Sequence, residues 1–316
     1  MANLNQLNCA SDVANTGFGS CFLDMKQIVG AFIVPNGYAL SAADLADIQA
    51  ALIADTKAVV KLNRVFPVGN FVGVTSATED KTVQTFPYGG KKVVREGFYD
   101  WSFQFTEGGL CLQQALRKFN SNAAWSILFY DSEFHLFGTK GLVAGSLYGI
   151  PLEILWANPW MPNDGSNSAV YHLQTVFKPR YINEELAFVP AGSYLQDIEG
   201  LQDVDIVVNT WNQTTGVVNA AISSKCGTNL GEIYSTELPV VGNFKASNKV
   251  TGAAITITSV AYVSTTKTFN ITIDTADADF PATTEGVLLD LAANTVLEAA
   301  GVVGYESAGP VNLATT

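Results

Sequence analysis

The stretch that decides the fold covers residues 93–105 and reads Val93-Val94-Arg95-Glu96-Gly97-Phe98-Tyr99-Asp100-Trp101-Ser102-Phe103-Gln104-Phe105. In its second half, aromatic side chains occupy every other position, with Asp100, Ser102 and Gln104 between them. Successive side chains of a strand point to opposite faces, so this alternation predicts a strand with one buried, aromatic face. After Gly108 and Gly109, apolar residues at helical spacing predict a short amphipathic helix over 110–119.

The surrounding segments predict further strands and one more helix. Residues 27–35 read as a strand that Pro35 ends, and Ser41 and Asp44 suit the start of a helix over 41–56. A hairpin is expected from Trp125–Tyr130 and 133–137, and strands over 58–68, 71–75, 150–157 and 169–178. The first part of the chain is therefore predicted to be mainly β (α+β), an antiparallel sandwich or barrel with one or two packed helices.

Composition shifts near residue 236, because all five tryptophans and all four cysteines lie before that point. The segment 268–274 alternates clearly, and short strands are also expected at 254–260, 286–291, 295–299 and 310–314. Strands at this spacing over about 80 residues are typical of a sandwich. We expect a β domain at 1–235 and an immunoglobulin-like β-sandwich at 236–316. Truncation at about 236 is then expected to leave assembly intact.

The bulk composition excludes several function classes. Apolar residues make up 48% of the chain and charged residues 15%, with a net charge of −12. A chain with a net negative charge is poorly suited to binding nucleic acid, because that binding requires clustered cations. No apolar run is long enough to predict a membrane helix. The first residues lack the basic and apolar parts of a secretory signal, so folding in a cytoplasm is expected.

The residues that carry chemistry are sparse. The four cysteines are widely spaced and are expected to be buried free thiols, which predicts no metal site. His135 is close to Glu133 in sequence, but a partly exposed strand histidine is the favoured interpretation; His172 has no neighbouring acid. Asp100 is interpreted as a solvent-facing strand acid. No nucleophile elbow or phosphate loop occurs, so we expect no catalytic residue, no cofactor and no enzyme.

The sequence 156–165, Trp-Ala-Asn-Pro-Trp-Met-Pro-Asn-Asp-Gly, predicts a stiff amphipathic loop because it contains two tryptophans and two prolines. Aromatic and Met side chains are enriched in interface cores, although such a loop also suits sugar stacking or the capping of its own core. The candidate subunit contacts are Trp156, Pro159, Trp160, Met161, Tyr99 and Trp101.

The order of strand, short helix and hairpin from Val93 to Phe137, extending to about Tyr181, resembles the tail tube subunits of long-tailed bacteriophages. Many such subunits also carry an immunoglobulin-like C-terminal domain, which 236–316 resembles. The resemblance implies a virion protein, made in the host cytoplasm, that forms six-membered rings stacked into a hollow tube. It also implies that neighbouring sheets close a barrel around a lumen through which DNA passes without specific binding.

The same resemblance implies that loops 69–92 and 138–150 bridge stacked rings, that the C-terminal domain decorates the outside, and that the partners are other copies and other tail or neck proteins. The helix at 41–56 and the polar first twenty residues exceed a minimal tube fold. Two alternatives therefore stay open. One is another virion component, such as a capsid decoration, neck or tail-completion protein. The other is a carbohydrate-binding or hydrolytic β-protein that uses the Trp156–Trp160 segment.

Overall fold

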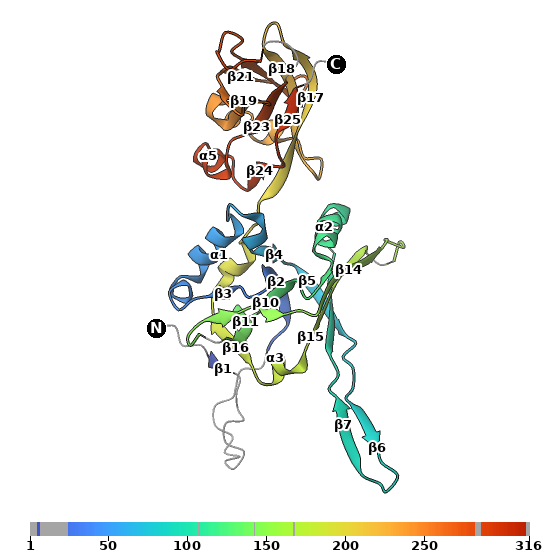
Figure 1. The fold of residues 1–316 in the computed structure, drawn as a ribbon. Helices are drawn as coiled ribbons and strands as arrows, with labels where there is room; N and C mark the ends of the chain where they lie inside the picture. The colour runs from blue at the N-terminus through green and yellow to red at the C-terminus, as the bar shows by residue number, and fades with distance from the viewer. Residues whose placement is uncertain are drawn as a thin grey trace. The chain divides into compact units, whose positions relative to one another are not determined.

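The computed structural model describes residues 5–6, 25–106, 108–141, 143–166, 168–281 and 286–313. The chain forms two compact units, Met1–Gly200 and Leu201–Thr316 (Figure 1). The sequence placed this division at 236. That position is wrong, because two strands of the second unit precede it.

The first unit contains a central sheet that is buried on both faces. Its main path runs in the order β1-β16-β11-β10-β2-β4, with β3, β12 and β13 beside it. The bounds are β1 (Asn5–Gln6), β2 (Ile28–Pro35), β3 (Ala39–Leu40), β4 (Phe66–Val68), β10 (Trp125–Asp131), β11 (His135–Lys140), β12 (Leu147–Tyr148), β13 (Ile150–Pro151) and β16 (Leu186–Pro190). On β10, Ile127 and Phe129 enter one hydrophobic cluster while Leu128 and Tyr130 enter another on the opposite face. The predicted strand at 27–35 and the hairpin at 125–137 are confirmed.

Helices cover one face of the central sheet. A 3-10 turn, η1 (Asp44–Ala46), leads into α1 (Ile48–Thr56), whose buried Ile48 and Leu52 pack on that face. The backbone N–H of Asp44 donates to the Ser41 hydroxyl at 3.3 Å, and the N–H of Ser41 donates to the Asp44 carboxylate at 2.8 Å. The predicted helix at 41–56 therefore exists but is divided at Asp47, whose carboxylate caps α1.

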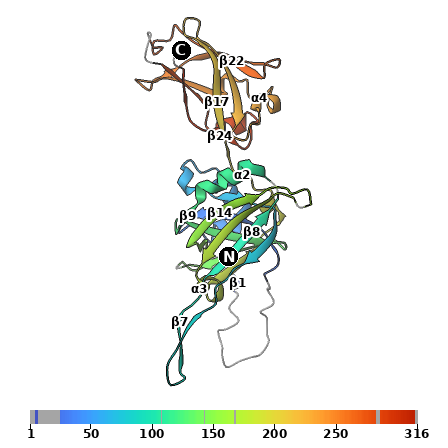
Figure 2. The same cartoon turned by 90° about the vertical axis from the view of Figure 1, so that its right-hand side faces the viewer.

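The outer sheet packs on the other face of the central sheet in the order β5-β8-β15-β14-β9 (Figure 2). Its strands are β5 (Phe71–Ser76), β8 (Tyr99–Phe105), β9 (Ser121–Asn122), β14 (Ile154–Met161) and β15 (Val170–Phe177). Phe103 and Phe105 are buried between the two sheets, and the polar residues of β8 point away from the core. Alternation thus identified 99–105 correctly, whereas 93–95 belong to a different strand.

Shorter helices complete the first unit. They are α2 (Gly109–Leu116), η2 (Lys61–Asn63), η3 (Arg117–Phe119), α3 (Pro179–Asn183) and η4 (Ser193–Gln196). The predicted helix at 110–119 is confirmed as α2 followed by the 3-10 turn η3. Of the expected extended segment 58–68, only β4 is a strand, because η2 occupies its middle.

The second unit is a sandwich of two sheets around a single core. One sheet has the order β21-β22-β18-β17-β24 and the other β20-β19-β23-β25. The bounds are β17 (Gln202–Asn212), β18 (Val217–Ser224), β19 (Phe244–Asn248), β20 (Ala254–Ile255), β21 (Ile257–Val263), β22 (Thr268–Ile273), β23 (Val287–Leu291), β24 (Tyr305–Ser307) and β25 (Val311–Leu313), with α4 (Leu230–Ile233), η5 (Val241–Asn243) and α5 (Asn294–Ala299).

This strand order is that of an immunoglobulin-like sandwich. Strands β17, β18, β22 and β21 take the positions A, B, E and D, and β19, β23 and β25 take C, F and G. The sandwich prediction is therefore confirmed, but its boundary omitted strands A and B. The strand expected at 295–299 is wrong, since these residues lie in α5.

Candidate assembly surfaces

The first candidate surface is a hairpin that we call the arm, residues 77–98, which connects β5 to β8. It contains β6 (Thr82–Thr85) and β7 (Lys91–Arg95), and every residue of both strands is exposed. Figure 1 shows the arm projecting away from the sheets. An isolated two-stranded hairpin with both faces exposed is only marginally stable in water. The arm therefore has the character of a segment that a partner covers.

The outer part of the arm is basic and aromatic. Residues 81–95 contain Lys81, Lys91, Lys92 and Arg95 but no acid, so all 29 acidic residues of the chain lie elsewhere. Tyr88 at the tip is fully exposed, and 43% of Phe86 is exposed. Two hydrogen bonds between Phe86 and the glycines that follow Tyr88 close the tip turn. The tip thus presents two aromatic rings flanked by cations.

The base of the arm has a defined geometry. The N–H of Ala77 donates to the Asp100 carbonyl at 2.8 Å, and that of Glu79 donates to the Phe98 carbonyl at 3.0 Å. Arg95 forms an ion pair with Glu79 at 2.8 Å, and its guanidinium lies 6.0 Å from the centre of the Phe98 ring. These contacts continue the β5–β8 pairing into the arm.

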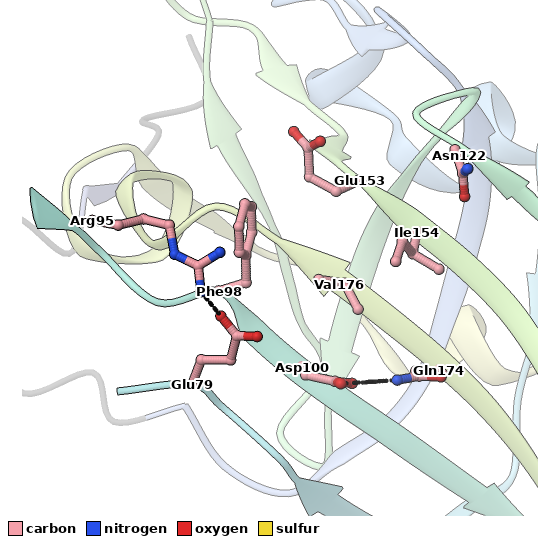
Figure 3. Close-up of a pocket in the computed structure, with 9 residues that line it drawn as sticks. All are labelled: Glu79, Arg95, Phe98, Asp100, Asn122, Glu153, Ile154, Gln174 and Val176. Carbon is pink, nitrogen blue, oxygen red and sulfur yellow. Dashed lines mark hydrogen bonds and ion pairs between the residues drawn. The ribbon is translucent and has the colours of Figure 1, made fainter. Parts of the chain in front are cut away.

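A pocket of about 500 Å³ opens beside this base (Figure 3). The Asp100 carboxylate accepts from the Gln174 amide at 2.8 and 2.9 Å, and Glu153 forms an ion pair with Lys178 at 2.9 Å. Hydrogen bonding to Glu153 raises the pKa of the exposed Lys178 ammonium group. Asp100 lies on a strand face that points away from the core, as predicted, but it is half-buried and hydrogen-bonded to Gln174.

The second candidate surface is the outer face of the outer sheet. Cross-strand pairing aligns Asn158, His172 and Gln104 in one row and Trp156, Gln174 and Ser102 in the next. Asp100, Val176 and Ile154 form a third row. None of these nine side chains is Lys or Arg. The face thus mixes six polar with three apolar side chains and is almost uncharged, with Asp100 as the acid of these rows.

The structure separates the six predicted contact residues into two groups. Tyr99 and Trp101 pack on the core between the sheets, where both rings contact Phe177. Tyr99 also donates to the Asn183 side chain at 2.9 Å. These two residues are half-buried within the chain's own fold.

The other four contact residues lie on β14, so the prediction of a loop at 156–162 is wrong. The exposed fractions are 44% for Trp156, 39% for Trp160 and 61% for Met161, and Pro159 is also exposed. Pro159 is tolerated because it lies at a bulge in an edge segment, where its missing N–H breaks no ladder. Near this edge, Ala157 donates to the Asn120 side chain at 2.7 Å, and Gln113 donates to the Asn158 carbonyl.

The remaining candidate polar residues form hydrogen bonds that belong to the fold itself. The Asp131 carboxylate is fully buried and accepts from the backbone N–H groups of Glu133 and His135 at 3.0 and 2.9 Å. His135 Nδ1 lies 3.3 Å from Asp131, and Glu133 is in the turn, not on the sheet face. Among the described residues, no group of three His, Cys, Asp or Glu is placed to hold a metal.

The prediction of buried free thiols is wrong for two cysteines. Cys111 and Cys226 are disulfide-bonded, the first half-buried and the second exposed. Cys9 and Cys21 lie outside the described residues. The spacing of the cysteines along the sequence did not reveal these bonds, because the two cysteines of a disulfide need only be close in space.

The arm as a hairpin is the feature that the sequence prediction missed. Its signal was present, since Pro87, Gly89 and Gly90 mark a turn between two short β-branched segments.

Neither a scan against models of known protein families nor a search of curated proteins found a match to this chain. Within the described residues, no helix combines the length and apolar character required to cross a bilayer.

Proposed function

We propose that this chain is a structural subunit of a phage tail tube, in which copies assemble into rings that stack around a conduit for DNA. The observation that carries the proposal is the arm, a hairpin with a basic outer part, exposed along both strands, that projects from one end of a two-layered β domain. The segment 69–92, which the resemblance implies bridges stacked rings, contains β5 and the arm as far as the start of β7.

The outer face of the outer sheet supports the conduit part of the proposal. Binding to DNA depends on cations that displace counterions from phosphates, and the three rows on this face contain none. The polar residues of these rows offer hydrogen bonds and a single carboxylate, and the apolar residues between them, Trp156, Ile154 and Val176, carry no charge. In the proposed tube this face lines the lumen, where a surface without cations suits DNA that slides past it.

The β5 edge of the outer sheet supports closure into a ring. Among the described residues, β5 pairs with β8 alone, and Val72 and Val74 on it are 55% and 52% exposed. Open sheet edges with exposed apolar residues are prone to pairing with other chains. The opposite edge, on β14, is partly covered, because the Asn120 and Gln113 side chains bond the Ala157 N–H and the Asn158 carbonyl. Pairing of the β5 edge with a strand of a neighbouring copy extends the sheet toward a closed ring.

Negative-stain electron microscopy of the purified full chain over a range of concentrations tests the proposal. Rings or tubes of uniform width are the expected result. A protein that stays monomeric at millimolar concentration, in both low and physiological salt, would contradict it. Deletion of residues 81–95, with the ends joined by a short Gly-Ser turn, should abolish stacking while the fold of both units remains.

A further inference from the structure

The arm tip and the end of β14 lie at opposite ends of the same sheet. Strand register shows this, because Tyr99 at the arm end pairs with Phe177, whereas Phe105 at the other end pairs with Tyr171. Met161 pairs with Val170, one position farther from the arm. The twelve residues from Ala77 to Tyr88 span on the order of 35 Å when extended, directed away from that end. A tip therefore reaches the end of β14 only in another copy.

The end of β14 is built as a receptor for an aromatic group. Trp160 stacks on Tyr171 with ring centres 6.3 Å apart, and Tyr171 stacks on the buried Phe105 at 5.6 Å. Phe105 in turn contacts Phe71, so Trp160 continues a column of rings that begins in the core. Met161 beside it is 61% exposed and adapts readily to a partner. A rigidly supported, half-exposed tryptophan is a typical energetic centre of an interface.

Charge favours contact between tip and β14 over contact between two tips. Near the tip the arm carries Lys81, Lys91 and Lys92 and no acid, while Arg95 at the base is paired with Glu79, so two arms laid together would bring six lysines into one interface. The segment 154–169 contains one acid, Asp164, and no cation. Like charges placed opposite each other cost several kcal/mol in an interface, whereas opposite charges steer association.

From these observations we propose that Phe86 and Tyr88 of one copy dock against Trp160 and Met161 of a second copy. The contact is heterologous, since it joins two different surfaces, and it repeats from copy to copy along a stack. The inference deepens the proposed function by naming both partners of a contact between subunits. It also stands alone as a statement about how this chain binds itself.

The first experiment replaces Tyr88 with the photo-crosslinking residue p-benzoylphenylalanine in the full chain. Irradiation followed by peptide mapping should give intermolecular cross-links within residues 154–161 and their β15 neighbours. Cross-links confined to residues 81–95 of the second chain would instead show contact between arms. That result, cross-links at any other surface, or none at all would each overturn the docking proposal.

The second experiment uses two variants and a control. The tip variant is Phe86→Ser with Tyr88→Ser, the strand variant is Trp160→Ala with Met161→Ala, and the control is Leu62→Ala. Leu62 is an exposed apolar residue on η2 and belongs to neither proposed partner of the contact. The first two should each weaken self-association at least about tenfold, and the control less than about threefold.

Mixing the two variants separates a heterologous contact from a general loss of folding. The tip variant keeps an intact β14 and the strand variant keeps an intact tip, so a 1:1 mixture should form dimers that do not extend. Analytical ultracentrifugation that finds only monomers in the mixture would contradict the proposal. Dimers without rings or tubes in the wild type would refute the tube function alone. Tubes with cross-links elsewhere would refute the docking alone.

Discussion

The backbone of Gly97 lies so close to the carbonyl oxygen of Glu79 that a side chain at position 97 would overlap it. Gly97 is buried at the base of the arm, directly beside the hydrogen bond from Glu79 to the Phe98 carbonyl. Two strands of the arm are thus held together where they leave the sheet.

Substitution Gly97→Ala should therefore disturb the arm and spare the core. The added methyl group forces the backbones of residues 97 and 79 apart. This should cost about 1–3 kcal/mol of stability, concentrated at the base of the arm. Limited trypsin digestion should cleave at Lys91 and Lys92 faster than in the wild type, because the strands fray. Self-association measured by ultracentrifugation should weaken in parallel.

Gly90→Ala is the matched control for that substitution. A methyl group at Gly90 would meet only the Phe86 ring at 3.8 Å, an ordinary contact, so its effect should stay within about 0.5 kcal/mol. Equal trypsin sensitivity of the two variants would show that the base of the arm is not the point of constraint.

The revised domain boundary predicts how fragments fold. Residues 201–316, with Cys226→Ser to prevent intermolecular disulfides, should unfold cooperatively on heating. Residues 236–316 should lack a cooperative transition, because they lose β17 and β18. Those strands supply Val204, Ile206, Val218, Ala220 and Ile222 to the core. Circular dichroism and amide chemical-shift dispersion distinguish the two outcomes, and a folded 236–316 fragment would restore the earlier boundary.

Sequence alternation identified strands that are buried on one face, because burial imposes a period of two on side-chain polarity. Residues 99–105 follow this rule with Phe103 and Phe105 inward. The arm does not follow it, since both faces of β6 and β7 are exposed and neither selects for apolar residues. For that reason 93–95 were assigned to the neighbouring strand.

Local residue preferences misled where tertiary context decides. Two prolines suggested a loop at 156–162, but a bulged edge segment accommodates Pro159 within β14. Thr295 and Val296 suggested a strand, yet they form α5, whose Leu297 packs into the sandwich core. The sequence alone likewise could not separate the buried candidate contacts from the exposed ones, because the burial of Trp101 depends on its packing against the opposing sheet.

Asp131 predicts a large and specific loss of stability in the first unit. Its buried carboxylate accepts from two backbone N–H groups in the turn between β10 and β11. Asp131→Ala would leave these donors without an acceptor, which should lower the free energy of unfolding by about 2–4 kcal/mol. Asp131→Asn retains one oxygen and should lose less, and Ser132→Ala at the exposed neighbouring position should change little. Urea denaturation measures all three, and equal losses for Ala and Asn would contradict the hydrogen-bonding explanation.

Tyr130 predicts a loss of stability at alkaline pH. Burial raises the pKa of Tyr130 to about 12, against an ordinary value of 10.0. Between these values the unfolded chain releases the phenolic proton and the folded chain retains it. Stability should therefore be unaffected by this group below pH 10 and fall by about 1.4 kcal/mol per pH unit above it.

Tyr130→Phe removes this titration while keeping the ring that packs against Phe32 at 5.6 Å. Half-buried Tyr38, whose pKa is also raised by burial and by its hydrogen bond to Asp55, is present in both proteins and cancels in the comparison. Urea denaturation at pH 8, 9, 10 and 11 should show the variant gaining stability relative to the wild type only above pH 10. A difference that stays constant across this range would mean that the Tyr130 hydroxyl ionises equally in the folded and unfolded chain.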